Sequence, residues 1–300
     1  FIDIDKDTFN ISIENITKKL KTAKKKKKTP KIVVAVDFGG NPYDHKKLYE
    51  LSRKYNFKII TDASHSLGSR YKNYKIGECR WSDITVFSFH PVKPITTAEG
   101  GIAVTNNKSL FEKLKVFRNH GISRDIKKYQ KKINQKWYYE QIDLGYNYRM
   151  NELQAALGIS QLKKLDNFNL KRNKIANFYK KNLKNLPIKF QEIDKNNFST
   201  YHLFVILFPK SIIRKKIYNK IFNFFLKKNI DINLHYLPVH LHPFFRLKGF
   251  KEGSYPISEE YSKRAISLPI YPSLTFQNQN KIVNIIKKVF KKYFNNEIIK

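Results

Sequence analysis

Cysteine is almost absent from this chain, because Cys79 is the single one in 300 residues. A lone thiol has no partner for an internal disulfide, and one cysteine is too few for a thiolate metal site. Long apolar runs are missing too, since no window approaches the ~18–20 apolar residues that a membrane span needs. No charged and then apolar leader opens the chain. We therefore expect a globular cytoplasmic protein without a membrane partner.

Acidic residues are also scarce, because 24 Asp and Glu stand against 59 Lys and Arg, which gives a formal net charge of +35. Such an excess is typical of proteins that bind nucleic acid or another polyanion. Arginine, which is favoured for bidentate contacts to phosphates and bases, supplies only 10 of these 59 residues. The lysines are spread over the whole chain. We therefore expect no nucleic-acid partner, and salt-resistant binding to a nonspecific duplex would contradict this.

The first half of the chain predicts alternating strands and helices. Residues 31–37 form a continuous apolar run that ends at Gly39 and Gly40, and residues 44–55 have the spacing of an amphipathic helix. A short buried strand over residues 57–61 follows. Because strand, helix and strand alternate, we expect parallel pairing in a layered α/β domain.

The second half predicts a smaller α+β domain. Residues 151–183 have a long helical periodicity, interrupted only by Gly158, that suits a connector between domains. Further expected elements are a helix over 10–20 capped by Ser12, a basic loop over 24–28, an exposed insertion over 127–140, a strand over 201–208, a helix over 211–228, and helices from Ser258 and Gln277. We divide the chain into a large domain over residues 1–165 and a small domain over residues 166–300.

A lysine lies on the turn between two predicted strands, residues 83–89 and 102–105. This lysine, Lys93, belongs to the stretch SFHPVKPITTAEGG (residues 88–101). An amine becomes a covalent catalyst when burial or a neighbouring cation lowers its pKa, because only the neutral form attacks a carbonyl. In a chain so rich in lysine, a solvated loop lysine is the alternative interpretation.

An acid and an imidazole follow the strand predicted over residues 57–61. They are Asp62 and His65 of DASHSLG (residues 62–68). Ligands of open α/β sheets bind at the carboxyl ends of strands. A carboxylate and a lysine in such a crevice are what pyridoxal phosphate (PLP) requires, because the amine holds the cofactor and the anion keeps its pyridine nitrogen protonated. Neither residue is specific alone, since Asp62 also suits an Asx turn.

Two histidines in the chain's second half raise a metal site as an alternative. His240 and His242 stand beside Pro243, without a carboxylate or cysteine close in the sequence. Two imidazoles make an incomplete site. We therefore expect no metal.

Four separated motifs resemble the DegT/DnrJ/StrS family of PLP-dependent nucleotide-sugar aminotransferases, and within it the PseC-type enzymes of pseudaminic acid biosynthesis. They are, in order, DASHSLG (62–68), SFHPVKPITTAEGG (88–101), GYNYRMNE (145–152) and HYLPVH (235–240). Their number and order make the signal specific, although any one would be weak. The resemblance implies an α/β PLP-dependent transferase type I (aspartate aminotransferase-like) large domain with a smaller α+β C-terminal domain. Family members carry a further segment before the equivalent of Phe1, so we expect the large domain to be N-terminally incomplete.

The resemblance also implies roles for individual residues. Lys93 would be the Schiff-base lysine, Asp62 would pair with the pyridine nitrogen, and His65 would lie beside the ring and its phenolic oxygen. Ser88 would bind the cofactor phosphate, and Asn147 would reach the phosphate of the neighbouring subunit, so that a homodimer shares its active sites. The expected substrate contacts are Asn233, His235 and Tyr236. From the residues alone, this last group is equally a packed histidine-tyrosine turn.

The reaction implied by the resemblance is the transfer of an amino group from L-glutamate to the C4 ketone of a UDP-linked 2-acetamido-2,6-dideoxy-4-hexulose. This belongs to the synthesis of pseudaminic acid or a related surface sugar. Two alternatives stay open: an aminotransferase acting on another keto-sugar nucleotide, or a catalytically silent or basic binding homologue. The presence of both Lys93 and Asp62 argues against a silent homologue, because only catalysis requires the pair.

Overall fold

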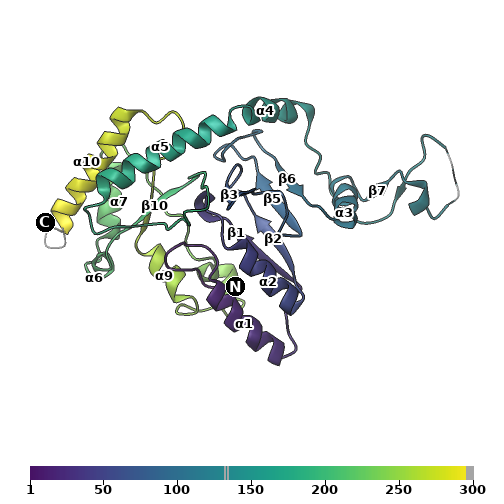
Figure 1. The fold of residues 1–300 in the computed structure, drawn as a ribbon, viewed down its shortest axis with the longest axis horizontal. Coiled ribbons are helices and arrows are strands. Elements are labelled where there is room, and N and C mark those ends of the chain that lie inside the picture. The colour runs from purple at the N-terminus through teal and green to yellow at the C-terminus, as the bar shows by residue number, and fades with distance from the viewer. Residues whose placement is uncertain (132, 134, 295–300) are drawn as a thin grey trace.

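The computed structural model describes residues 1–131, 133 and 135–294, and it has an α/β body from which an arm projects on one side (Figure 1). The body holds a sheet in the order β1-β2-β5-β6. Its strands are β1 (Ile32–Val36), β2 (Lys58–Asp62), β5 (Ile84–Ser88) and β6 (Gly101–Val104). The first three are parallel, as predicted, and β6 is antiparallel to β5. The chain returns from β5 to β6 without the crossover helix that usually joins parallel strands.

Two helices pack against each other beside this sheet, α1 (Ile13–Lys25) and α2 (His45–Tyr55). The predicted cap of α1 is confirmed, because the side chain of Ser12 accepts a hydrogen bond from the Asn15 amide. The helix continues to Lys25, so the prediction of a loop over residues 24–28 is wrong for its first two residues. Lysines in a last helical turn are stabilised by the negative end of the helix dipole.

The arm contains α3 (Lys108–Arg118), the 3-10 helix η2 (Ile126–Lys128) and the hairpin of β7 (Ile122–Ser123) with β8 (Glu140–Gln141). In Figure 1, α3 and β7 stand away from the sheet. Most of the predicted insertion over residues 127–140 is irregular, and residues 132 and 134 of it lie outside the described residues.

The predicted long helix is two helices, α4 (Glu152–Leu162) and α5 (Leu165–Leu183). Gly158 is not the interruption, because it lies inside α4 and the break falls between Leu162 and Leu165. A glycine costs a helix only ~1 kcal/mol relative to alanine. Its absent side chain serves packing instead, since a Cβ there would lie 2.8 Å from Cγ2 of Thr97.

The remainder of the chain packs around a second, antiparallel sheet in the order β11-β10-β9. Its elements are β9 (Lys189–Phe190), β10 (Phe204–Leu207), α6 (Ser211–Arg214), α7 (Tyr218–Leu226), η3 (Val239–Leu241), α8 (Pro243–Arg246), α9 (Pro256–Ser262), β11 (Ala265–Leu268) and α10 (Phe276–Tyr293). The helix predicted over residues 211–228 is broken where Lys216 adopts a positive φ of 50°. Phe208, Phe225 and Phe290 fill the core, each with no exposed surface.

The boundary predicted between residues 165 and 166 stays a prediction, because α5 contacts both halves of the chain. The Asn169 side chain donates to the Leu67 carbonyl oxygen at 3.3 Å, and the Tyr179 hydroxyl donates to the Pro269 carbonyl oxygen at 2.9 Å. Among residues 1–131, 133 and 135–294, none of the helices combines the length and the apolarity that crossing a membrane requires.

Candidate functional site

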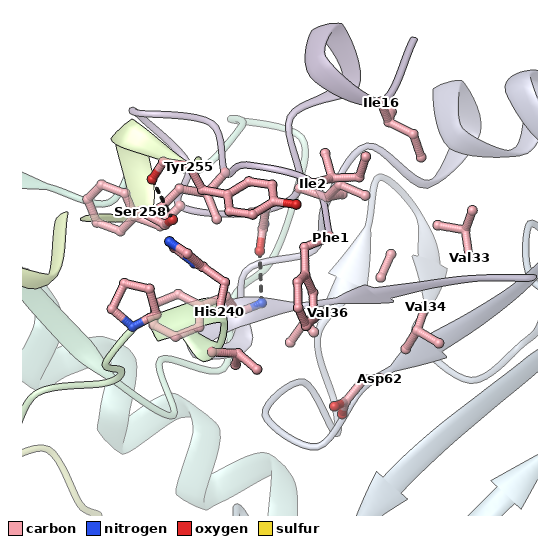
Figure 2. Close-up of a pocket in the computed structure, with 18 of the residues that line it drawn as sticks. Phe1, Ile2, Ile16, Val33, Val34, Val36, Asp62, His240, Tyr255 and Ser258 are labelled. Atoms are coloured by element: carbon pink, nitrogen blue, oxygen red, sulfur yellow. Dashed lines mark hydrogen bonds between the residues drawn. The ribbon is translucent and has the colours of Figure 1, made fainter. Parts of the chain in front are cut away.

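The candidate site lies where parallel strands end. Asp62 is the last residue of β2, Ser88 is the last residue of β5, and Lys93 follows on the turn toward β6. A cavity of about 860 Å³ adjoins this edge of the sheet. Five of the predicted site residues line it: Asp62, His65, Lys93, His235 and Tyr236. Figure 2 shows Asp62 beside Val34 and Val36, side chains of the neighbouring strand β1.

Lys93 is half-buried, and its backbone amide donates to the His90 carbonyl oxygen at 2.9 Å, which holds the turn. Burial lowers the pKa of its amine, while the nearby Asp62 carboxylate opposes that shift. Among the residues that the structure describes, no group forms a hydrogen bond or ion pair with Nζ of Lys93. The amine is therefore free to react, and its neutral form is easier to reach than that of a solvated lysine.

His65 is buried and is oriented by the backbone. Its Nδ1 atom accepts a hydrogen bond from the Gly39 amide at 3.3 Å, and its Nε2 atom lies 3.5 Å from the Tyr236 hydroxyl. Burial, helped by the charge of Lys93 and opposed by Asp62, lowers the pKa of the imidazole to about 3. Because an amide can only donate, the neutral ring carries its proton on Nε2 and presents a donor on the cavity side.

A buried carboxylate that the sequence analysis did not single out lies at the start of the loop that carries Gly39. Asp37, at the end of β1, has no exposed surface. It accepts hydrogen bonds from the Tyr43 amide at 3.0 Å and the Ser66 hydroxyl at 2.9 Å, and it contacts Nε2 of His45 at 2.9 Å. The signal available in the sequence was the glycine pair that follows the apolar run over residues 31–37.

Stability at mildly acidic pH is expected to depend on His65. Above its ordinary pKa of 6.5, the imidazole is neutral in both the folded and the unfolded chain. Below pH 6.5 only the unfolded chain takes up this proton, until the folded pKa of about 3 is reached. Lowering the pH to 5 should therefore cost the folded state roughly 2 kcal/mol through this group.

Urea unfolding at pH 7.5 and pH 5 tests this expectation. The loss of stability between the two pH values should be smaller in His65→Gln by about that amount. His90→Gln, at an imidazole that is 48% exposed, should lose as much stability as the wild type. Equal losses in His65→Gln and the wild type would show that His65 is protonated in the folded chain.

A second cavity, of about 910 Å³, adjoins the first. Lys93 and His235 line both cavities, and Asn233 lines the second. Nδ1 of His235 lies 2.8 Å from the Ser267 hydroxyl, and the backbones of Asn233 and Ser267 exchange two hydrogen bonds. The predicted substrate-contact segment is therefore attached to β11 and faces the same lysine.

Two predicted residues, Ser88 and Asn147, are not among the described residues that line the two cavities. Ser88 ends β5, and its hydroxyl accepts a hydrogen bond from the His90 amide at 3.4 Å. Asn147 is exposed and forms an isolated bridge with Asn119 at the end of α3. Within one chain, Asn147 is therefore not brought to either cavity by the part of the structure that is described.

His240 has a structural partner. Its Nε2 atom lies 2.7 Å from the Glu259 carboxylate, which also accepts hydrogen bonds from the amides of Gly253 and Tyr255. Both side chains are buried. The pair joins the segment after Tyr236 to α9, and so fixes one wall of the first cavity.

The residues of the first cavity fit PLP. The site offers an amine whose pKa is lowered by burial, a carboxylate at the end of the neighbouring strand, and a neutral imidazole donor. The cavity volume of about 860 Å³ is in the range of cofactor sites. Together these groups supply an amine for covalent attachment of the cofactor and a negative charge for its pyridine nitrogen.

Comparison with known proteins agrees with this chemistry. The sequence profile of the DegT/DnrJ/EryC1/StrS aminotransferase family matches residues 1–287. An uncharacterized protein of Methanocaldococcus jannaschii is 40% identical over 293 residues, which cover 96% of this chain and 73% of that protein. A UDP-4-amino-4,6-dideoxy-N-acetyl-beta-L-altrosamine transaminase of Campylobacter jejuni is 36% identical over 304 residues, which cover 98% of this chain and 74% of the relative.

Solved structures give the same result. Helicobacter pylori PseC, an aminotransferase involved in the biosynthesis of pseudoaminic acid, superposes with a TM-score of 0.86 at 31% identity. The match covers 98% of this chain and 74% of that one. S. venezuelae DesV, solved in complex with a ketimine intermediate, superposes with a TM-score of 0.82 at 27% identity, over 96% of this chain and 71% of that one. These similarities confirm the predicted resemblance and the predicted type I fold.

Proposed function

This chain belongs to the DegT/DnrJ/EryC1/StrS aminotransferase family, and we propose that it transfers the amino group of L-glutamate to the C4 ketone of a UDP-linked 2-acetamido-2,6-dideoxy-4-hexulose. That it is a PLP-dependent sugar aminotransferase follows from the family. The particular sugar is the proposal, and it is supported by the named activity of the Campylobacter relative and by the pathway in which the Helicobacter enzyme acts. The observation that carries the aminotransferase chemistry is the half-buried Lys93 amine, which shares a cavity with Asp62 and His65.

PLP, when bound, supplies an electron sink that makes an amino acid's α-proton removable. We assign Lys93 to hold the cofactor and then to move that proton between the substrate carbon and the cofactor carbon, which its lowered pKa favours. Asp62 provides the negative charge that keeps the pyridine nitrogen protonated. His65, with its proton on Nε2, donates to an oxygen of the cofactor ring. Ser88 binds the cofactor phosphate.

The substrate side of the site is built by the segment attached to β11. We assign Asn233, His235 and Tyr236 to the nucleotide sugar, because they line the two cavities that meet at Lys93. Burial, and then the charge of Asp62, raises the pKa of the Tyr236 hydroxyl, so this group stays protonated at neutral pH and can donate to the sugar.

An activity assay with matched sugars tests the proposed substrate. The chain with PLP and L-glutamate should convert the UDP-linked 4-keto sugar into a 4-amino sugar and form 2-oxoglutarate in equal amount. A relative from Escherichia coli is a GDP-perosamine synthase with 33% identity, so a GDP-linked 4-keto sugar is the informative comparison. Faster turnover of the GDP-linked compound would overturn the proposed nucleotide, and turnover of neither would overturn the proposed substrate.

We further propose that the active protein is a homodimer in which Asn147 of one subunit completes the phosphate site of the other. Asn147 is exposed on a surface that also exposes large apolar side chains, which single-chain proteins rarely do. Neighbouring examples are Leu144 (74% exposed), Tyr148 (71%) and Leu153 (84%).

Mixing two inactive variants tests this sharing. Lys93→Ala and Asn147→Ala should each be inactive alone, because each removes a different part of every site. After random exchange of subunits in an equal mixture, mixed dimers hold one intact site, so activity should return to about a quarter of the wild-type value. A mixture as inactive as the two variants would show that both residues act within one chain.

A further inference from the structure

We propose that the second cavity binds a carboxylate of the amino donor through the guanidinium of Arg172, with the neighbouring Lys171 adding positive charge. The inference rests on the proposed aminotransferase function and names where its donor is held. It concerns a residue of α5 that belongs to none of the sequence motifs.

Arg172 is a buried cation to which the described residues bring no anion. Only 6% of its surface is exposed, and its Nη1 atom donates to the Ile270 carbonyl oxygen at 2.5 Å. Its Nε atom is buried and finds no hydrogen-bond partner in the described part of the chain. Among the described residues, none of the ion pairs includes Arg172. Burial accordingly lowers the pKa of the guanidinium to about 10. A charge buried in this way is costly unless something pairs with it.

The ionisable groups that line the cavity beside Arg172 are mainly basic. Lys93, Lys171 and Arg172 face it together with two histidines, and Asp231, which is exposed, is the acidic residue of its described lining. One of the histidines, His202, is 7% exposed, and its buried Nδ1 atom has no hydrogen-bond partner among the described residues. The cavity therefore has two buried polar groups without partners and three basic side chains around it. This arrangement is expected of an anion site.

This cavity adjoins the cofactor side of the site. The rings of His202 and His65 lie with their centroids 4.5 Å apart, and Lys93 lines both hollows. An anion held by Arg172 would therefore occupy a cavity that Lys93 also lines.

The chemistry of the two substrates favours a carboxylate over a diphosphate as the bound anion. The α-carboxylate of an amino acid is attached directly to the carbon that reacts, so it must lie close to Lys93. The diphosphate of a nucleotide sugar is separated from the C4 ketone by the sugar ring. The planar fork of a guanidinium also matches the two oxygens of a carboxylate.

Binding of a non-reacting dicarboxylate tests the proposal. Glutarate has the carboxylates of glutamate but neither an amino nor a keto group, and its affinity can be measured by calorimetry for the chain with and without PLP. Arg172→Gln should weaken glutarate at least ~10-fold and leave the affinity for UDP unchanged. Lys174→Gln, an exposed lysine on the same helix, should change neither.

A purely structural role for Arg172 predicts a different pattern. Glutarate and UDP affinity would then fall together, along with the melting temperature, because the bond to Ile270 is lost. Weaker binding of UDP alone would assign the cavity to the diphosphate. Either of these two patterns would overturn the proposal. Unchanged glutarate binding in Arg172→Gln would overturn it as well.

Arg172→Lys covers the case in which the glutamine variant does not fold. It keeps a positive charge and a donor for the Ile270 carbonyl but lacks the fork, so it should fold and bind glutarate several-fold more weakly than the wild type. Wild-type affinity in this variant would overturn the proposal. Measuring glutarate binding without PLP separates this proposal from the proposed function. If the chain never attached PLP but still bound glutarate in a way that depends on Arg172, the proposed function would be refuted and the carboxylate site would be supported.

Discussion

Lys93→Ala is expected to remain folded and to lose all covalently held PLP. Lys93 lies half-buried on a turn, and its side chain forms no hydrogen bond or ion pair with the described residues. Removing it should therefore change the free energy of unfolding by less than ~1 kcal/mol. The cofactor, in contrast, loses the amine to which it is attached. Lys19 and Lys28 also line the first cavity, but Lys93 is the lysine whose charge acts on His65 and that lies near Asp62. Cofactor that survives gel filtration should fall from about one equivalent per chain to none.

Two further variants separate the amine from its charge. Lys93→Arg keeps a cation near Asp62 but cannot attach the cofactor, so it should lose PLP as completely as the alanine variant. Lys46→Ala, at an exposed lysine on α2, should bind PLP as the wild type does. Full retention of PLP by Lys93→Ala, with unchanged absorbance, would remove Lys93 from the assigned role.

Asp62→Asn is expected to retain PLP and to lose at least ~10²-fold in kcat, which is about 2.7 kcal/mol of transition-state stabilisation. The amide keeps the shape of the side chain and an oxygen that can accept the Ser64 amide, a hydrogen bond of 3.0 Å in the wild type. What it loses is the negative charge that keeps the pyridine nitrogen protonated. The effect should therefore appear in turnover and hardly in folding.

The two half-reactions make this prediction specific. Both the reaction with L-glutamate and the reaction with the keto sugar should slow, because both depend on the same ring nitrogen. Asp166→Asn, at an exposed aspartate in the first turn of α5, provides a matched loss of charge and should leave both rates unchanged. If Asp62→Asn slowed only one half-reaction, Asp62 would contact a substrate rather than the cofactor.

Local patterns in the sequence were sufficient for the parts of the fold that position Lys93 and Asp62. Each strand of the parallel sheet is a short apolar run bounded by turn residues, and ligand sites lie at the ends of such strands. The break near Gly158 could not be predicted in the same way. Whether a glycine ends a helix or admits a close neighbour depends on Thr97, which is distant in the sequence.

Contacts between distant parts of the chain account for what the sequence analysis missed. The proton position on His65 depends on the Gly39 amide, 26 residues away. Arg172 gains its significance from the lack of any described carboxylate paired with it and from its bond to Ile270, 98 residues away. Neither contact is signalled by a local pattern in the sequence. The role of Asn147 lies further out of reach, because it depends on a second copy of the chain.

The most direct test of the account is to locate where PLP attaches. The purified chain is incubated with PLP, reduced with borohydride and digested, and the added mass is located by peptide mapping. We predict one principal modified peptide, with the mass on Lys93 at about one equivalent per chain. Label scattered over the many exposed lysines, or a principal site at any residue other than Lys93, would contradict the assignment of the active site.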